Sequence, residues 1–434
     1  MKSTGLWLKE SKLSLDPEYI NRDRWVKMRG KRNIIILKFG GTSVGDADRI
    51  KKVADRIISA SLEANKVVAV VSAMGDTTDK LVDLAGEISS GPSRREMDML
   101  MSTGERVSGA LLAMAIQEKG HDCISLTGGQ AGIVTDEGYS NAKILYIKTD
   151  RILKELKKGR IVIVAGFQGI NMRGDITTLG RGGSDTTAVA LASALKAKYC
   201  EIYTDVEGVF STDPNVVCEA VKLDAISYDE MLELASCGAK VLHLRAIEFA
   251  KKNNVVLHIR SSFNDVEGTW IMDNYKKDDR MERPVITGVT YDVGEAKVSI
   301  FGLEDKPGIA ADLFGRLAKE NINVDLIVQN VSEKNFAAIS FTIRNENASL
   351  TEKVLSKIEN IRVEIDNDIA RVSIIGAGMQ THPGVAAKMF KILADKEINI
   401  EMISTSPIRI SCVVKRGEIK EAVKALHSGF GLSK

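Results

Sequence analysis

The sequence predicts an α/β protein whose mainly parallel sheet carries helices on both faces, a three-layer sandwich followed by two smaller α+β units. Two observations predict this fold. In the first part of the chain, short apolar segments alternate with segments of helical periodicity, which is typical of a parallel sheet covered by helices. In the second part, one stretch of sequence occurs twice, which indicates a duplicated small unit.

The first part contains the segments that predict the sheet. Continuous apolar runs predict strands at 34–39, 67–71, 161–165 and 201–204. Apolar residues recur at helical spacing from Ile50 to Ile58, and a Met-rich stretch at 94–117 predicts one or two helices. Gly-rich segments follow the strands. Because ligands bind beyond the carboxyl ends of parallel strands, we expect these segments to meet on one rim.

The duplicated stretch begins with a strand, at 297–302 and again at 371–376. A Pro-Gly pair follows in each copy, as Pro307-Gly308 and Pro383-Gly384. We place this pair at the turn that opens a helix, where the fixed φ of proline is tolerated. A second strand follows at 322–325 and 398–401, so each copy reads strand, turn, helix, strand.

Four parts are expected along the chain: an N-terminal extension at 1–31, a catalytic domain at 32–283, and two repeat units at 284–368 and 369–434. The boundary before the repeats falls in the charged stretch 276–283. The N-terminal extension is charged and lacks an apolar core, so it does not read as a signal peptide. We assign it no function.

Composition excludes several classes of protein. The net charge of +2, from 60 basic and 58 acidic residues, gives no support for nucleic acid or an acidic membrane as partner. No apolar run approaches the roughly 20 residues of a membrane span. The five cysteines are odd in number and lack CxxC spacing, so a disulfide framework is not expected and a cytoplasmic location fits. No histidine pair has metal-ligand spacing, and we expect no protein metal site.

The first motif with chemical meaning ends the first strand, in the sequence Lys38-Phe39-Gly40-Gly41-Thr42-Ser43. Glycines allow backbone N–H groups to approach an anion, and the following helix N-terminus favours negative charge. Lys38 offers a point cation for phosphate. A glycine turn with an incidental lysine explains the pattern equally well, because such strand–helix turns are common.

The second motif is Gly180-Arg181-Gly182-Gly183-Ser184-Asp185-Thr186-Thr187, followed by a helix at 188–197. Ser184 or Asp185 could serve only as the helix N-cap. That reading leaves three glycines and an arginine unexplained. Arg181 has a planar fork suited to a carboxylate, and Asp185 could hold an ammonium group or orient the reacting groups. Anion recognition explains both the arginine and the glycines, so we favour it.

Two weaker signals follow. Gly104 lies inside a helical pattern at a cost of about 1 kcal/mol relative to alanine, and close approach of a ligand beside Glu105 would justify it. A solvated Glu105–Arg106 pair is the simpler explanation. The stretch 204–214 is too turn-rich for a helix and suits a nucleotide, although a surface loop is the alternative. Lys240 is a candidate second phosphate cation, although a lone lysine is more often solvated.

Known phosphate-binding patterns are absent. Gly169 and Gly174 have P-loop spacing, but Asp175 stands where lysine is required. The Gly376-Ala377-Gly378 segment resembles a dinucleotide fingerprint, but Thr381 takes the place of its third glycine. The protein-kinase H-R-D signature is also missing. Any phosphate binding must therefore use other sequence motifs.

Taken together, the motifs resemble the aspartokinases of the amino-acid kinase family over residues 34 to about 430. The segments that carry the resemblance occur in fixed order, at 38–43, 72–78, 104–106, 166–169, 180–187, 204–214 and 238–240. The repeats resemble paired ACT domains, ferredoxin-like α+β modules that bind amino acids. The layout is similar to the monofunctional bacterial type, since no dehydrogenase domain follows residue 434.

The resemblance implies a role for each matching residue. Lys38 would contact the ATP phosphates and Asp185 would organise the site. Aspartate would be bound by Ser72, Thr78, Glu105, Arg181 and Ser184, with Arg181 on a carboxylate and Glu105 near the ammonium. The nucleotide would be bound by Lys38, Gly40, Gly41, Thr204, Asp205, Phe210, Asp213, Asn215 and Lys240. Phe210 and Asn215 replace the Tyr and Arg of many relatives, so those two contacts are in doubt.

The resemblance also implies the reaction and its control. ATP with Mg²⁺ would phosphorylate the side-chain carboxylate of aspartate, the first step toward lysine, threonine and methionine. Lysine, threonine or both would inhibit through the ACT domains, with one pocket lined by Asp305, Gly308 and Gln329. The ACT domains would join two chains in a homodimer or larger assembly. A shorter regulatory chain could start at Met272 or Met281.

Two rival functions remain. A kinase for another small acid, such as glutamate or carbamate, would share the glycine loops but gives no reason for the paired repeats. A non-catalytic amino-acid sensor would have an inert kinase-like domain and should have lost Lys38 or Asp185, yet the chain contains both.

Overall fold

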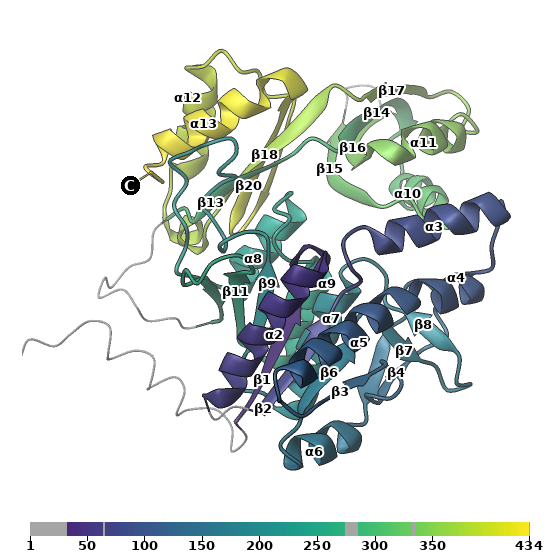
Figure 1. Ribbon diagram of the computed structural model, residues 1–434. Coiled ribbons are helices and arrows are strands. Elements are labelled where there is room, and N and C mark those ends of the chain that lie inside the picture. The colour runs from purple at the N-terminus through teal and green to yellow at the C-terminus, as the bar shows by residue number, and fades with distance from the viewer. Residues whose placement is uncertain (1–32, 64–65, 274–284, 332–335, 434) are drawn as a thin grey trace, which may run out of the picture.

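The computed structural model describes residues 33–63, 66–273, 285–331 and 336–433 (Figure 1). The expected N-terminal extension at 1–31, the charged boundary at 276–283 and Met281 lie outside the described residues. Two small units lie side by side along one edge of a larger α/β domain (Figure 1). No helix in the described part of the chain is both long and apolar enough to cross a membrane.

The large domain is built on an eight-stranded sheet. Its strands, in spatial order, are β10 (Ala225–Ile226), β12 (Thr269–Ile271), β11 (Leu257–Ser261), β9 (Cys200–Thr204), β1 (Ile34–Phe39), β2 (Lys66–Val71), β6 (Ile161–Ala165) and β3 (Cys123–Leu126). The run from β11 to β3 is parallel throughout, and β12 is antiparallel to β11. The four strands predicted for this domain are confirmed, and β1 and β6 have the predicted bounds. The strand predicted at 398–401 in the second repeat is wrong, because the chain there is a loop and strand β19 (Met402–Ser406) begins after it.

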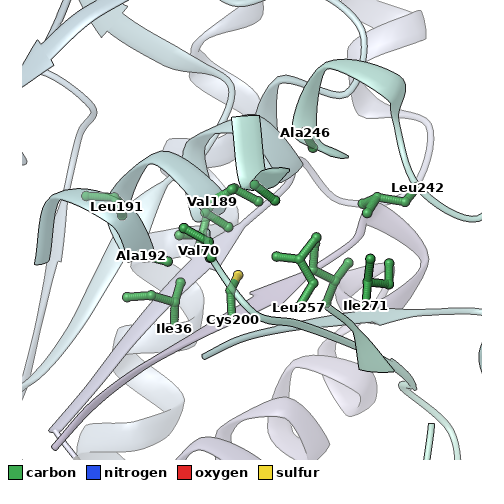
Figure 2. Packing of buried hydrophobic residues seen from close by; sticks show 14 of the residues in the cluster. Ile36, Val70, Val189, Leu191, Ala192, Cys200, Leu242, Ala246, Leu257 and Ile271 are labelled. Atoms are coloured by element: carbon green, nitrogen blue, oxygen red, sulfur yellow. The ribbon is translucent and has the colours of Figure 1, made fainter. Parts of the chain in front are cut away.

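Helices cover both faces of this sheet. The helices α2 (Ala47–Leu62) and α5 (Thr103–Glu118) pack on one face, while α6 (Asp150–Lys157), α7 (Gly183–Leu195), α8 (Tyr228–Ser236) and α9 (Leu244–Asn253) pack on the other. Alternation along β1 sends Ile35 and Leu37 to the first core and Ile34 and Ile36 to the second. Figure 2 shows Ile36 and its neighbours packing against α7. The predicted three-layer sandwich is confirmed.

A smaller sheet extends the large domain beside β6. Its order is β5 (Ile144–Ile147), β4 (Ile133–Thr135), β7 (Gln168–Ile170) and β8 (Ile176–Thr178), and it lies near α3 (Thr77–Ile88) and α4 (Arg94–Met101). The Met-rich stretch thus forms two helices, α4 and α5. A Cβ on Gly104, in the first turn of α5, would lie 2.7 Å from the Cβ of Ala73. The glycine therefore allows α5 to pack against the end of β2, which is a reason other than an approaching ligand.

The first repeat unit is a complete βαββαβ module. It contains β14 (Glu295–Glu304), α10 (Ile309–Lys319), β15 (Val324–Val331), β16 (Phe336–Arg344), α11 (Ala348–Leu355) and β17 (Arg362–Asp366). Its antiparallel sheet has the order β15-β16-β14-β17. The helix α10 begins directly after the predicted Pro-Gly turn, with Gly308 at φ +95°.

The second unit takes one strand from a distant part of the chain. It contains β18 (Ile369–Ile375), α12 (Val385–Ala394), β19 (Met402–Ser406), β20 (Arg409–Lys415) and α13 (Ile419–Gly429). Its fourth strand is β13 (Gly288–Asp292), which precedes the first unit in sequence and pairs antiparallel with β18. The first unit is therefore inserted within the second. The predicted unit bounds 284–368 and 369–434 stay predictions.

Buried charges join the two units to the large domain. Arg371 on β18 is fully buried and forms 2.7 Å ion pairs with Glu295 on β14 and Asp325 on β15. Its guanidinium also donates to the carbonyl of Ser236, at the end of α8. Breaking such a buried pair is costly, because it leaves an uncompensated charge inside the protein. One side chain thus fixes the relative position of three parts of the chain.

Candidate active site

The carboxyl ends of β1, β2, β6 and β9 meet on one rim, where the Gly-rich segments gather as predicted. After β1 the chain enters a 3-10 helix, η1 (Gly41–Val44). The N–H of Gly40 donates to the carbonyl of Tyr203 at the end of β9, and the N–H of Gly75 donates to the carbonyl of Gly41. A Cβ on Gly41 would lie 3.0 Å from the carbonyl oxygen of Ala73. A larger residue would therefore push apart the loops that follow β1 and β2.

A buried lysine and aspartate lie in contact at this rim. The alternation of β1 turns Lys38 toward α7, whose first turn contains Asp185. Lys38 Nζ and Asp185 Oδ1 are 2.6 Å apart, and the two side chains are 10% and 14% exposed. A lysine ammonium has three N–H donors, so Lys38 keeps N–H groups for another acceptor beside this contact. The pair fixes a cation at the end of β1.

A cavity of about 690 Å³ opens beside this pair. Residues of the large domain line one side, including Lys38, Asp185, Thr204, Lys240 and His243. The first repeat unit lines the other side through Glu295, Asn323, Asp325, Ile343 and Arg344. The volume is in the range of pockets for small molecules and cofactors, roughly 300–1,000 Å³. Sequence reasoning missed the second set, because no motif indicates which unit lies across the cavity.

His243 is also a lining residue that the sequence reading did not single out. A Cβ on Gly182 would lie 2.2 Å from the ring of His243. Gly182 also has φ +68° and precedes α7 directly. Glycine is therefore required there both for the left-handed backbone and for the close approach of the His243 ring. In the sequence, the glycine indicates that another group lies close to the backbone, but it does not indicate which residue that is.

Glu105 is a buried carboxyl group on α5. Its Oε1 accepts from the N–H of Ala73 at 3.3 Å, and its Oε2 has no hydrogen-bond partner among the described residues. Burial raises the pKa of Glu105 to about 7, against the opposing effect of its backbone hydrogen bonds. A second, smaller cavity of about 80 Å³ lies beside Glu105 and Arg106. The carboxylate therefore gains stability from any cation that reaches it.

The other predicted substrate residues lie on neighbouring loops of the same rim. Ser184 is buried in the first turn of α7, and a Cβ on Gly166 would lie 2.7 Å from its hydroxyl oxygen. Ser72 follows β2 and donates its N–H to Phe39 at the end of β1. Thr78 lies in the first turn of α3 and is half-buried. Arg181 is exposed and forms no ion pair with any described residue.

The predicted nucleotide residues separate into two groups. Thr204 and Lys240 line the large cavity, and exposed Asp205 follows Thr204, whose hydroxyl donates to its carboxylate. Phe210, Asp213 and Asn215 lie further along the loop and are not among the lining residues described. There Asp213 accepts from the hydroxyl of Tyr291 on β13 at 3.1 Å. This end of the loop therefore faces the second repeat unit in this conformation.

The predicted regulatory residues lie on the surface of the first repeat unit. Asp305 and Gly308 belong to the exposed turn before α10. Gln329 is exposed on β15, which is an edge strand of its sheet. Within the described ranges, no group of three or more His, Cys, Asp or Glu side chains is arranged to hold a metal ion.

Comparison with known proteins agrees with this architecture. The profile of the amino acid kinase family matches residues 33–261, and ACT-domain profiles match 298–363 and 372–430. An aspartokinase of Geobacillus stearothermophilus is 52% identical over 400 residues, which are 92% of this chain and 98% of the relative.

Two solved structures are similar over the whole described fold. The first is E. coli aspartokinase III in complex with aspartate and ADP in its R-state, which is 27% identical with a TM-score of 0.76 and aligns over 91% of this chain and 99% of its own. The second is the same E. coli protein in complex with lysine and aspartate in its T-state, at 27% identity and a TM-score of 0.73, over 92% and 100%. The chain therefore belongs to the aspartokinases, ATP-dependent kinases of the amino acid kinase family with C-terminal ACT domains.

Proposed function

We propose that this chain transfers the γ-phosphoryl group of ATP to the side-chain carboxylate of L-aspartate. The carboxylate oxygen forms the new bond to phosphorus, the bond from the γ-phosphorus to the bridging oxygen breaks, and ADP and 4-phospho-L-aspartate result. The observation that carries the proposal is the buried Lys38–Asp185 contact at the strand rim, open to a cavity of nucleotide size. The E. coli relative bound to aspartate and ADP supports the same choice of substrates.

Aspartate is proposed to bind between α5 and the loop before α7. Glu105 takes the ammonium group, because its buried carboxylate has an oxygen without a partner in the described structure. Arg181 takes a carboxylate through its planar fork, which is available because the guanidinium is exposed and forms no ion pair with a described residue. Ser72, Thr78 and Ser184 complete the pocket with hydroxyl groups.

ATP is proposed to occupy the large cavity. Lys38 contacts the transferring phosphoryl group, and the backbone at Gly40 and Gly41 receives the phosphates. Thr204, Asp205 and Lys240 hold the rest of the nucleotide. Phe210, Asp213 and Asn215 join this site only if the loop moves from its contact with β13, because they do not line the cavity in this conformation.

The chemistry needs charge compensation more than a base. The aspartate carboxylate is ionised near pH 7, so the nucleophile has no proton to lose. The barrier lies in bringing one anion onto another, and positioned cations lower it. Mg²⁺ would neutralise phosphate charge when bound. The described residues offer it Asp185 but no three-ligand cluster, which fits a metal held mainly by phosphate oxygens and water.

The assay that tests the function compares three acceptor conditions. ADP release is measured with aspartate, with glutamate and with no acceptor, and hydroxylamine is added to trap any acyl phosphate as a hydroxamate. We expect aspartate-dependent turnover on the order of 1–100 per second and the hydroxamate of aspartate. Equal ADP release without acceptor, or preference for glutamate, would contradict the assignment.

The pH dependence of aspartate binding tests the role of Glu105. With a pKa of about 7 in the free protein, Glu105 is largely neutral below that pH and cannot pair with the substrate ammonium. We therefore expect kcat/KM for aspartate to fall about tenfold per pH unit below 7. The kcat profile should be flatter, because bound ammonium lowers the pKa of Glu105 in the complex. KM for ATP serves as the control.

The variant Glu105→Gln should abolish this titration and raise KM for aspartate at all pH values, since the neutral amide cannot pair with the ammonium. Retention of the full slope in that variant would assign the titration to another group.

Regulation is part of the proposal. Lysine, threonine or both inhibit by binding the ACT domains, and Asp305, Gly308 and Gln329 line one pocket. The E. coli relative in complex with lysine supports an amino acid as the regulator. A homodimer through the ACT domains completes these pockets. Its edge strand β15 exposes Ile327 at 51%, and an edge strand favours pairing with another chain.

The described contacts support a route from the second ACT domain to the nucleotide loop. The carbonyl of Ser211 accepts from the N–H of Val289 on β13 at 2.7 Å, and its hydroxyl lies 2.9 Å from Nε2 of buried His427 on α13. Val217 packs in the hydrophobic core of the second unit. Any shift of that unit therefore moves the loop that begins at Thr204.

The five free cysteines suit the cytoplasmic location that belongs to this proposal.

Inhibition by amino acids is the expected outcome of an activity titration with lysine, threonine and both. Coupling between sites is typically 1–3 kcal/mol, so inhibition should be roughly 5- to 150-fold at saturation. Asp305→Ala should weaken inhibition and leave uninhibited kcat unchanged. Asp312→Ala, at an exposed carboxylate in the first turn of α10, is the matched control. No inhibition at about 10 mM, tenfold above a weak binding constant, would leave the ACT domains without this role.

A further inference from the structure

Two segments of backbone flank the turn that contains Arg181. One is the loop 140–142, and the other is the end of β8 with Leu179. They are joined by a hydrogen bond from the N–H of Ala142 to the carbonyl of Thr178 at 2.9 Å. A Cβ on Gly180 would lie 3.1 Å from the carbonyl of Ser140, so the turn lies directly against the loop. The position of the turn therefore depends on both segments.

Asp98 on α4 binds the N–H groups of the two segments. Its carboxylate is fully buried and accepts five hydrogen bonds. The N–H of Ser140 donates to both oxygens at 3.0 Å, and Thr178 donates through its N–H at 2.8 Å and its hydroxyl at 2.7 Å. No basic side chain of the described chain pairs with Asp98. Neutral donors from these two segments therefore satisfy the whole charge.

Ser140 needs such an anchor, because its φ is +67°. A left-handed conformation is unfavourable for a residue with a side chain, because its Cβ lies too close to the following carbonyl oxygen. The charge-assisted hydrogen bonds from its N–H and hydroxyl to Asp98 offset this cost.

Arg245 on α9 binds the carbonyl groups of the same two segments. Its Nη1 donates to the carbonyl of Leu179 and its Nη2 to the carbonyl of Ala142, both at 2.7 Å. Asp98 thus accepts from the N–H groups of the two segments, and Arg245 donates to their carbonyl groups. The planar fork of an arginine suits two carbonyls held at a fixed separation, which a lysine cannot reproduce.

We propose that Asp98 and Arg245 are positioning residues that hold the turn at Gly180–Gly182, so that Arg181 reaches the carboxylate of aspartate. The inference rests on the proposed role of Arg181. Arg181 is exposed and forms no ion pair in the described structure, and the glycines beside it have φ of +76° and +68°. Inside the turn, the N–H of Gly183 donates to the carbonyl of Gly180 at 2.9 Å, while Asp98 and Arg245 hold the segments on its two sides. Small misplacements of a binding group can cost up to about 100-fold in rate.

The test separates positioning from general stability. Asp98→Asn keeps the shape but replaces an acceptor with an amide donor that faces two N–H groups. Arg245→Gln removes both bonds to carbonyls from a half-buried surface position, and it carries the test if Asp98→Asn does not fold. We expect each to raise KM for aspartate about tenfold or more, while KM for ATP changes less than threefold. Arg245→Lys should restore only part of the loss.

Matched controls come from α6 and the turn that follows it, at the far end of the large domain from the ACT domains (Figure 1). Glu155 is a buried carboxylate there, paired with Lys158 and Arg160. Glu155→Gln and Arg160→Gln should lower thermal stability without changing KM for aspartate. Equal KM changes in the controls would show a general structural effect and overturn the inference.

The comparison with Arg181→Lys distinguishes this inference from the proposed function. If Arg181→Lys raises KM for aspartate and the Asp98 and Arg245 variants do not, the positioning role is wrong and the substrate assignment stands. If Arg181→Lys leaves KM for aspartate unchanged, the role of Arg181 itself is wrong, and the positioning inference falls with it.

Discussion

The contact between Lys38 and Asp185 is the interaction on which the rest of the site depends. Two anions must meet for a phosphoryl group to pass to a carboxylate, and a fixed cation is the simplest way to reduce their repulsion. A lysine is costly to bury without a partner, so Asp185 must lie within reach. The first turn of α7 supplies it at 2.6 Å. Strand alternation on β1 and the glycine turn before α7 bring the two side chains together.

The regulatory units are built into the same framework. The first ACT domain forms one wall of the large cavity, and the second binds the loop that follows β9. Arg371 ties both domains to α8 through ion pairs with Glu295 and Asp325 and a hydrogen bond to the Ser236 carbonyl. A ligand that prefers one arrangement of the ACT domains therefore also selects one arrangement of the cavity. The proposed regulation needs no long pathway, because the ACT domains and the catalytic domain share a cavity wall and the loop after β9.

Local sequence patterns predicted the sheet well and distant contacts poorly. Continuous apolar runs gave β1 and β6 with their bounds, because a buried parallel strand needs apolar residues on both faces. The membership of β13 in the sheet of the second ACT domain was not predictable, because the whole first ACT domain lies between β13 and β18 in the sequence. Gly104 was correctly marked as needing a reason, but the reason is its packing against Ala73. The burial of Asp98 was not predicted, because a single carboxylate in a Met-rich helix is expected to face solvent.

The most direct test of the account is a double-mutant cycle on Lys38 and Asp185, measured as kcat at saturating aspartate and ATP. Lys38→Ala alone should lower kcat by about 100-fold or more, since each group aimed at developing charge contributes roughly 2.7–4 kcal/mol. Lys51→Ala, at an exposed ion pair, should leave kcat unchanged. If the pair acts as one unit, the variant with Lys38→Ala and Asp185→Asn should be no slower than the slower single variant. Losses that multiply would show two independent residues and contradict the central claim.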